Sequence, residues 1–210
     1  MVNTSNMIKQ TLHKYANKNS KLAREAKKGN IIKIINGLYE TDPNTPGYLL
    51  AGSIYGPSYI SFEYALSYYG LIPERVTTIT SATLLKKKQK KYYTPFGTFT
   101  YRDVPALVFP EAVLLKEENN YAYQIALPEK AICDKLYTLK PIHNYQELEN
   151  ILFKDLRIDY DEFIKLDEII ITKLTNLCTA AVIFPLVGNI NNISVQKSHK
   201  VVTPFDCSAV

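Results

Sequence analysis

Glu129, Lys130 and Asp134 come nearest to an enzymatic set in residue type and spacing, and all three lie in the segment LPEKAICDKLY (127–137). Carboxylates bind Mg²⁺ and a lysine can stabilise a phosphate, so this set could serve a metal-dependent nuclease. This segment predicts a helix with Pro128 at its first position and Glu129 in its first turn. Adjacent residues on a helix, however, point about 100° apart, and acidic residues are common in the first turn of a helix. We therefore predict no catalytic residue and keep the nuclease as an alternative.

No other pattern in the sequence suggests catalysis or metal binding. The chain has no GxSxG, GxGxxG, HExxH or P-loop motif, and no CxxC. Its cysteines and histidines are few and scattered, which predicts reduced thiols, no metal site and no cofactor. These residues are Cys133, Cys178, Cys207, His13, His143 and His199.

A second chemistry, the binding of a polyanion, is suggested by basic residues near the N-terminus. In NKNSKLAREAKKGN (17–30), Ser20 is predicted to cap a helix and Gly29 to end it. Basic residues then lie on one face of this helix and apolar residues on the other. The predicted DNA-binding residues are Ser20, Lys21, Arg24, Lys27, Lys28 and, in the next segment, Lys33.

The elements around this basic helix predict a winged helix-turn-helix. Residues 5–16 have helical spacing, and Asn36-Gly37 between apolar runs predicts a hairpin over IIKIINGLYE (31–40). A basic helix presents cations to phosphates or base edges, and the hairpin flanks it. Since a winged helix normally has three helices before its wing, this one is truncated. The alternative is that the basic residues form the solvated face of a surface helix.

A lysine run, KKKQKKYY (86–93), lies farther along the chain. Such a run is usually a solvated loop or an edge strand that is protected from aggregation. The functional alternative is a second phosphate-contacting surface, with Tyr92 and Tyr93 as stacking partners. Its basic residues would be Lys86, Lys87, Lys88, Lys90 and Lys91.

The net charge of +5 is spread unevenly. Lys and Arg outnumber Asp and Glu by eight to three over residues 1–42 and by eleven to eight over residues 43–140. Over residues 141–210 they are outnumbered by nine to six. The excess of cations in the first two thirds indicates a polyanion partner there.

The Tyr-rich segment SFEYALSYYG (61–70) predicts a short helix capped by Ser61 and ended by Gly70. One apolar stripe, Phe62, Ala65, Leu66 and Tyr69, is expected to face the core. A second stripe, Tyr64 and Tyr68, is interpreted as packing rather than as a binding surface.

The Pro- and Gly-rich stretch TDPNTPG (41–47) predicts a domain boundary. After it, period-two patterns predict strands over 74–83, 97–104, 106–109, 113–116 and 121–126, and a helical section begins at about residue 143. We predict an α+β fold, with a truncated winged-helix segment over residues 1–44 and a mixed α/β domain with a helical C-terminal part over residues 45–210.

We expect a cytoplasmic protein with no membrane partner. The N-terminal MVNTSNMIKQTLHKY has no continuous apolar region that would indicate a signal peptide. The most apolar stretch, residues 169–190, is interrupted by Lys173, Asn176 and Pro185, which favours a core helix and strand over a membrane span.

Five segments, in this order, together resemble one family. They are KLAREAKKGNIIKIINGLYE, PSYISFEYALSYYGLIPE, TPFGTFTYRDVP, LPEKAICDKLY and DLRIDYDEFIKLD, and they cover about residues 20–170. The combination is similar to the AbiEi-type antitoxins of type IV toxin–antitoxin and abortive infection systems, which are also described as predicted transcriptional regulators of viral defence. Each segment alone is a weak signal, and the five in order are more specific.

The resemblance implies a winged-helix domain that binds operator DNA and represses the antitoxin–toxin operon. It also implies a C-terminal domain that neutralises a nucleotidyltransferase-like toxin, often without a stable complex. Ser20–Lys28 and Ile31–Tyr39 match the family's DNA-binding helix and wing, and no toxin-neutralising residue can be carried over. The alternative to an antitoxin is a transcriptional regulator without a toxin partner.

Overall fold

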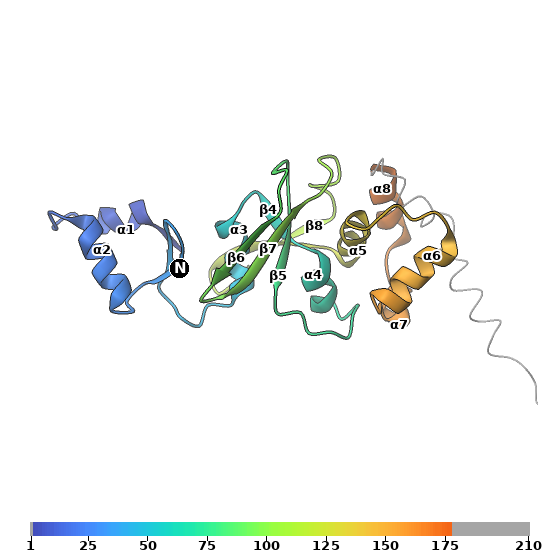
Figure 1. The fold of residues 1–210 in the computed structure, drawn as a ribbon, viewed down its shortest axis with the longest axis horizontal. Coiled ribbons are helices and arrows are strands. Elements are labelled where there is room, and N and C mark those ends of the chain that lie inside the picture. The colour runs from blue at the N-terminus through green and yellow to red at the C-terminus, as the bar shows by residue number, and fades with distance from the viewer. Residues whose placement is uncertain (1, 178–210) are drawn as a thin grey trace, which may run out of the picture.

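Two separate β-sheets organise the chain in the computed structural model, which describes residues 2–177. The strands of the small sheet end at Glu40, and those of the large sheet begin at Ser58. Helices accompany both sheets, so the predicted α+β class is confirmed. Figure 1 shows the small sheet at one end of the molecule, the large sheet in the middle and a group of helices at the other end. The predicted C-terminal part from Cys178 onward lies outside the described residues.

The small sheet belongs to what we call the N-terminal unit, residues 2–40. The chain passes through a strand, two helices and a hairpin, and β3 pairs with both other strands in antiparallel fashion. This is the order of a winged helix from which one helix is missing within the described residues. The elements are β1 (Asn3–Thr4), α1 (Ser5–Thr11), α2 (Lys18–Lys27), β2 (Ile32–Ile35) and β3 (Leu38–Glu40).

The two helices of the N-terminal unit have boundaries that differ from the prediction. The first ends at Thr11 instead of residue 16. The second begins at Lys18, because the side chain of Asn17 accepts a hydrogen bond of 3.0 Å from the N–H of Ser20. An Asn at this position satisfies an otherwise unpaired amide of the first turn. The prediction that Ser20 caps the helix is therefore wrong.

The turns of the N-terminal unit agree with the sequence. Gly29, just after α2, has a φ of +77°, and Gly37 in the β2–β3 turn has a φ of +87°. Both are left-handed conformations in which a residue without a Cβ atom has no steric penalty.

The N-terminal unit has a small apolar core. α1 contributes no buried side chain, and its Met7 is 46% exposed. α2 contributes Leu22, and Ile31, Ile34 and Leu38 complete the buried set. Because so little apolar surface is buried, the unit depends on its contacts with the rest of the chain.

Glu40 provides one such contact where the chain leaves β3. Its carboxylate is fully buried and accepts a hydrogen bond of 2.7 Å from the hydroxyl of Tyr121. The backbone N–H groups of Thr41 and Asp42 donate to it over 2.7 and 3.1 Å. A buried carboxylate needs these donors, so Glu40 holds the end of the N-terminal unit against the large sheet.

The large sheet has six strands in the order β6-β7-β5-β4-β9-β8. The pairs β4–β9 and β5–β7 are parallel and the other pairs are antiparallel, so the sheet is mixed. Its edge strand β6 lies near β2 of the N-terminal unit. The strands are β4 (Ser58–Ile60), β5 (Ile79–Thr83), β6 (Lys90–Thr94), β7 (Gly97–Asp103), β8 (Val113–Glu118) and β9 (Tyr121–Ala126).

Two of the predicted strands differ in the structure. Residues 106–109 form a turn, in which the N–H groups of Val108 and Phe109 both donate to the carbonyl oxygen of Pro105. Residues 74–78 precede β5 without joining it, because Ser67 bonds the carbonyl oxygen of Glu74 and the N–H of Val76. In both places a local hydrogen bond replaces the strand ladder.

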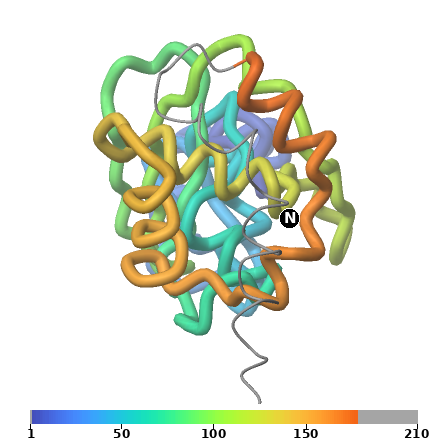
Figure 2. Tube along the Cα trace, turned by 90° about the vertical axis from the view of Figure 1, so that its right-hand side faces the viewer, coloured from blue at the N-terminus to red at the C-terminus, as the bar shows by residue number. Residues whose placement is uncertain are grey.

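Helices cover the sheet and form the C-terminal part that Figure 2 shows end-on. α5 starts at its predicted Pro128, and the helical section after residue 143 is confirmed. The helices are η1 (Gly47–Leu50), α3 (Ala51–Ile54), α4 (Phe62–Tyr68), α5 (Pro128–Tyr137), α6 (Tyr145–Asn150), η2 (Ile151–Asp155, a π-helical turn), α7 (Tyr160–Phe163) and α8 (Glu168–Leu177).

The Tyr-rich helix α4 packs mainly as predicted. Phe62, Ala65 and Leu66 are buried. The helix ends at Tyr68, and the predicted terminator Gly70 follows the C-cap residue Tyr69 with a φ of +73°. The second stripe is less buried than expected for packing, since Tyr68 is 46% exposed. Ser61 occupies the N-cap position, but its hydroxyl makes no capping bond.

Gly47 of η1 lies close to the turn between β6 and β7. A Cβ atom at this position would overlap the carbonyl oxygen of Phe96 and lie 2.8 Å from Cδ1 of Ile79. We expect Gly47→Ala to lower the free energy of unfolding by about 1–3 kcal/mol, because the backbone must shift to relieve the overlap. Gly52→Ala is the matched control, since nothing lies within 4 Å of the added methyl group. Urea unfolding would measure both, and equal stability of the two variants would contradict this packing.

Candidate nucleic-acid interface

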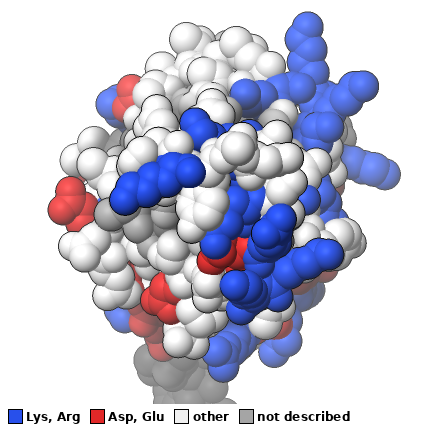
Figure 3. Space-filling view, turned by 90° about the vertical axis from the view of Figure 1, so that its left-hand side faces the viewer, with Lys and Arg blue, Asp and Glu red and all other residues white. Residues whose placement is uncertain are grey.

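α2 presents most of the predicted DNA-binding cations to solvent. Arg24, Lys27 and Lys28 are exposed, and none of them has an ion-pair partner among residues 2–177. In Figure 3, which looks at the end of the molecule that carries the N-terminal unit, Lys and Arg gather mostly on one side of the face. The acidic residues lie mostly on the opposite side of this view.

Lys21 is the exception on α2, because its charge is already paired. Its Nζ lies 2.6 Å from Oε1 of Glu25, one helical turn on, and 4.9 Å from the ring centroid of Tyr15. The hydrogen bond to Glu25 raises the pKa of Lys21, and the same bond lowers the pKa of Glu25. A phosphate would have to compete with Glu25 for Lys21, so we expect Lys21 to contribute less to binding than Arg24 or Lys28.

The other two predicted DNA-binding residues, Ser20 and Lys33, lie on different elements. Ser20 is exposed on the first turn of α2. Lys33 is exposed on β2, opposite Tyr39 of β3. The structure thus distributes the predicted set over α2 and the first strand of the wing.

The lysine run is divided by the structure into two parts. Lys90 and Lys91 lie on β6, the edge strand near β2, and both are exposed. Lys87 and Lys88 lie on the preceding loop and belong to the lining of a hollow. Lys86 packs its Nζ 5.0 Å from the ring centroid of Tyr55. The prediction that part of the run is an edge strand is confirmed.

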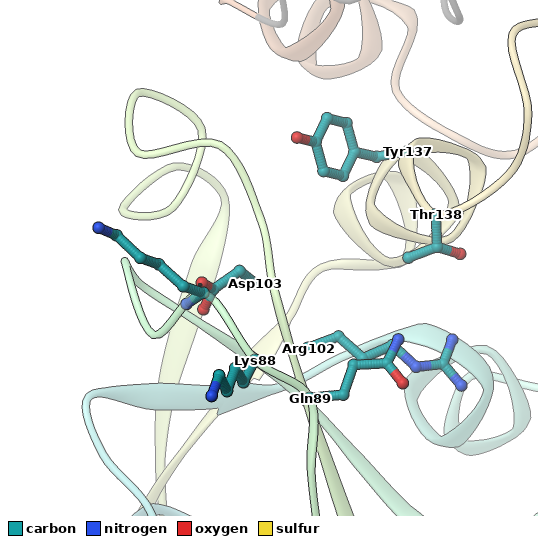
Figure 4. Close-up of a pocket in the computed structure, with 7 residues that line it drawn as sticks. Lys88, Gln89, Arg102, Asp103, Tyr137 and Thr138 are labelled. Carbon is teal, nitrogen blue, oxygen red and sulfur yellow. Dashed lines mark hydrogen bonds between the residues drawn. The ribbon is translucent and has the colours of Figure 1, made fainter.

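The hollow, which we call the β5–β6 hollow, has a volume of about 270 Å³. One side is formed by Lys87, Lys88 and Gln89 of the loop together with Arg102 and Asp103 of β7. The other side is formed by the end of α5, with Tyr137 and Thr138, as Figure 4 shows. This grouping cannot be predicted from the sequence, because no local spacing connects β7, the loop and α5.

The side chains of Glu129, Lys130 and Asp134 do not all meet in the structure. Nζ of Lys130 lies 2.6 Å from Oδ1 of Asp134, and both side chains are buried. Oδ2 of Asp134 accepts hydrogen bonds from the hydroxyls of Tyr59 (2.9 Å) and Ser61 (2.7 Å). Oε1 of Glu129 instead accepts the backbone N–H of Asp167 over 2.9 Å.

The two carboxylates of this set therefore point to different partners and do not converge on a common ion. Among residues 2–177, no three His, Cys, Asp or Glu side chains are grouped so that they could hold a metal ion. Burial raises the pKa of Asp134, and the attraction of Lys130 acts in the opposite direction. Burial also raises the pKa of the Tyr59 phenol, whose ring centroid lies 5.5 Å from the Lys130 ammonium.

No family model matches the chain, and no curated protein matches it either. In the part of the chain that the structure describes, no helix has the length and apolar character needed to cross a membrane.

Breaking the Lys130–Asp134 pair from one side should be costly. In Lys130→Met the buried carboxylate of Asp134 loses the cation that is paired with it, which we expect to lower the free energy of unfolding by about 3–5 kcal/mol. Lys130→Met/Asp134→Asn should lose less, because the amide is uncharged and its oxygen still accepts from Tyr59 and Ser61. Urea unfolding of the single and double variants checks this. A double variant less stable than Lys130→Met would show that the pair is not coupled in this way.

Proposed function

We propose that the protein is the antitoxin of a type IV toxin–antitoxin system and that its N-terminal unit binds operator DNA. The observation that supports this best is the exposed basic surface of α2 beside the β2–β3 hairpin, on a unit with winged-helix order. The proposed role is non-enzymatic and belongs to the cytoplasm. The partners are operator DNA and a nucleotidyltransferase-like toxin, which is neutralised functionally even without a stable complex.

The DNA-binding part of the proposal is supported by charge and exposure. Arg24, Lys27 and Lys28 project from α2, and Lys33 adds a cation on the wing. Phosphate contacts from such residues supply most of the affinity for DNA and position a helix for reading base edges. Lys90 and Lys91 of β6 extend the basic surface beyond the N-terminal unit, because β6 lies near β2.

The antitoxin part of the proposal is supported by the contacts between the segments that carry the resemblance. Ser61 in the second segment bonds Asp134 in the fourth. Glu63, also in the second, lies 3.8 Å from Arg102 in the third and pairs with Lys135 in the fourth.

The fifth segment joins the same cluster of contacts. The N–H of Asp159 donates to the carbonyl oxygen of Leu71 over 2.8 Å, and the N–H of Asp167 donates to Glu129. Segments that are distant in sequence thus specify one another's positions, as expected when a pattern defines a fold.

A transcriptional regulator without a toxin partner is the second candidate, because the basic surface alone would suffice for it. The nuclease alternative is not proposed, since Glu129 and Asp134 bind different partners. A neighbouring gene for a nucleotidyltransferase-like protein would favour the antitoxin over the regulator.

A growth assay tests the antitoxin. Expression of the neighbouring reading frame alone should arrest growth, and co-expression of this chain should relieve the arrest. A harmless neighbour, or an arrest that persists on co-expression, would argue against the antitoxin. A variant with Lys130→Met serves as a destabilised control, and it should relieve the arrest less well at elevated temperature.

Replacing Arg24 and Lys28 by Ala should weaken operator binding and reduce the slope of log affinity against log salt by about one to two units, because two phosphate contacts are lost. Fluorescence anisotropy over a salt series would measure this. Lys140→Ala/Lys154→Ala is the matched control, since it removes two exposed cations from the opposite end of the molecule. Equal losses in both variants would mean that only the total charge matters.

A further inference from the structure

The two edge strands of the large sheet differ in charge. The edge strand β6 has the sequence KKYYT, with two lysines and no acidic residue. The other edge strand, β8, has the sequence VLLKEE, with one lysine and two glutamates. Acidic residues are absent from the whole stretch 75–102, which contains seven Lys or Arg residues. A polyanion is therefore attracted to the β6 edge and not to the end of β8.

β6 also carries the most exposed aromatic side chain in the described part of the chain. This residue is Tyr93, whose side chain is 75% exposed. The neighbouring Tyr92 points to the opposite face of the sheet, where its ring centroid lies 5.8 Å from that of the buried Tyr101 and 6.1 Å from that of Tyr55. Of the two tyrosines that the sequence suggests as stacking partners, only Tyr93 is therefore available to a base.

Lys91 projects from the same face as Tyr93, because the two residues lie two positions apart on one strand. Its Nζ lies 4.9 Å from the centroid of the Tyr93 ring, a distance at which an ammonium is attracted to the ring. The lysine lies over one face of the ring, and the high exposure of Tyr93 leaves room for a planar group at the other. Lys91 has no ion-pair partner among residues 2–177, so its charge is available to a ligand.

Further cations lie beside this pair. Lys90 precedes Lys91 on β6 and is exposed. Lys33 is exposed on β2, and β2 lies near β6. Figure 1 shows β6 on the side of the large sheet that is next to the N-terminal unit. The β6 edge therefore adjoins a second source of positive charge.

A second lysine–tyrosine pair lies at the β8 edge and differs in its surroundings. Nζ of Lys116 lies 4.8 Å from the ring centroid of Tyr68, which is 46% exposed. Here Nζ also donates to the Tyr68 hydroxyl over 3.0 Å, and Glu117 and Glu118 follow on the same strand. Because this cation is already engaged and its surroundings are acidic, the pair at β8 is less suited to a phosphate.

We propose that the β6 edge binds single-stranded nucleic acid, with one base stacked on Tyr93 and the adjacent phosphates at Lys90 and Lys91. Proteins hold single strands by this combination of aromatic side chains that stack on bases and cations that contact the backbone. The bases inside a duplex already stack on one another, so they offer no free face to a ring on a strand edge. The partner is therefore an unpaired stretch, and stacking tolerates any of the bases because each has a flat face.

This inference does not rest on the proposed function, because no residue of α2 takes part and a toxin is not involved. The test is fluorescence anisotropy of the full chain with a labelled oligothymidylate of about 15 nucleotides, a length within the range that such surfaces cover. An abasic oligomer of the same length keeps the phosphates and cannot stack. The wild-type chain should bind the oligothymidylate saturably and about tenfold more tightly than the abasic oligomer.

Tyr93→Ala should weaken binding of the oligothymidylate by about tenfold and leave the slope of log affinity against log salt unchanged, because it removes stacking and no charge. The same variant should bind the abasic oligomer like the wild-type chain. Tyr93→Phe keeps the ring and should retain the affinity. Lys90→Gln/Lys91→Gln should weaken binding of both oligomers and reduce the salt slope by about 1.4 units, since two phosphate contacts to a single strand are lost.

Tyr68→Ala is the matched control, because it removes an exposed tyrosine with a lysine over its ring from the other edge of the same sheet. It should leave the affinity for the oligothymidylate unchanged. Thermal melting of each variant shows whether the fold is intact. An oligouridylate of the same length distinguishes RNA from DNA as the source of the strand, and Tyr93→Ala should weaken binding of whichever oligomer the wild-type chain prefers.

Four outcomes would overturn the proposal. They are no saturable binding of either oligomer with bases, equal affinity of the wild-type chain for the abasic oligomer, unchanged affinity in Tyr93→Ala, and equal losses in Tyr93→Ala and Tyr68→Ala. The second outcome would mean that the edge attracts any polyanion. Arg24→Ala/Lys28→Ala should keep the preference for the oligothymidylate over the abasic oligomer even where it loses operator binding, so the two proposals can fail separately.

Discussion

The buried carboxylate of Asp134 is the constraint on which the centre of the fold depends. A charge without water needs donors for its oxygens, and removing one is costly. Three segments supply them: Lys130 from the same helix, Tyr59 from β4 and Ser61 from the start of α4. The position of α5 relative to the sheet and to α4 is therefore fixed by one side chain.

The start of α4 shows what this constraint requires locally. Ser61 stands where a helix cap is expected, yet its hydroxyl donates to Asp134 instead of accepting from its own helix. The next residue, Phe62, has a φ of +56°, which is rare for a bulky side chain and costs on the order of 1–3 kcal/mol. Complete burial of Phe62 and the stacked guanidinium of Arg102 offset this cost. Arg102, held in this way, is also one of the residues that line the β5–β6 hollow.

The elements that could be predicted from the sequence are those specified by short-range chemistry. The Asn36-Gly37 turn, the Pro128 helix start and the Gly70 helix end each depend on neighbouring residues, and each is confirmed. The prediction that Ser20 caps α2 is wrong because Asn17, one turn earlier, is an equally good cap. The strand predicted over residues 106–109 failed because Pro105 supplies a competing acceptor.

The candidate sites could be predicted only in part, for the same reason. The exposed cations of α2 follow from helical spacing, so Arg24 and Lys28 could be named. Arg102 and Tyr137 could not be named in this way. They line one hollow only because β5 pairs with β7 in parallel and α5 packs nearby. Sequence periodicity does not predict which residues of distant elements lie side by side. The position of Glu129 in the first turn of a helix suggests a capping or catalytic role. Its actual partner, the N–H of Asp167, could not be predicted because it lies far along the chain.

The placement of acidic residues explains how a modest net charge can produce a strongly basic surface. Glu40, Glu129 and Asp134 are buried, and their oxygens are taken up by hydroxyls, backbone N–H groups or Lys130. Asp103 likewise accepts a hydrogen bond from the backbone N–H of Lys87 in the β5–β6 loop. These four carboxylates thus hold parts of the fold together, while most of the lysines in the first two thirds of the chain stay in solvent. A polyanion near α2 or β6 would meet the cations without the anions that balance them in the formal sum, and this separation favours binding more than the value of +5 suggests.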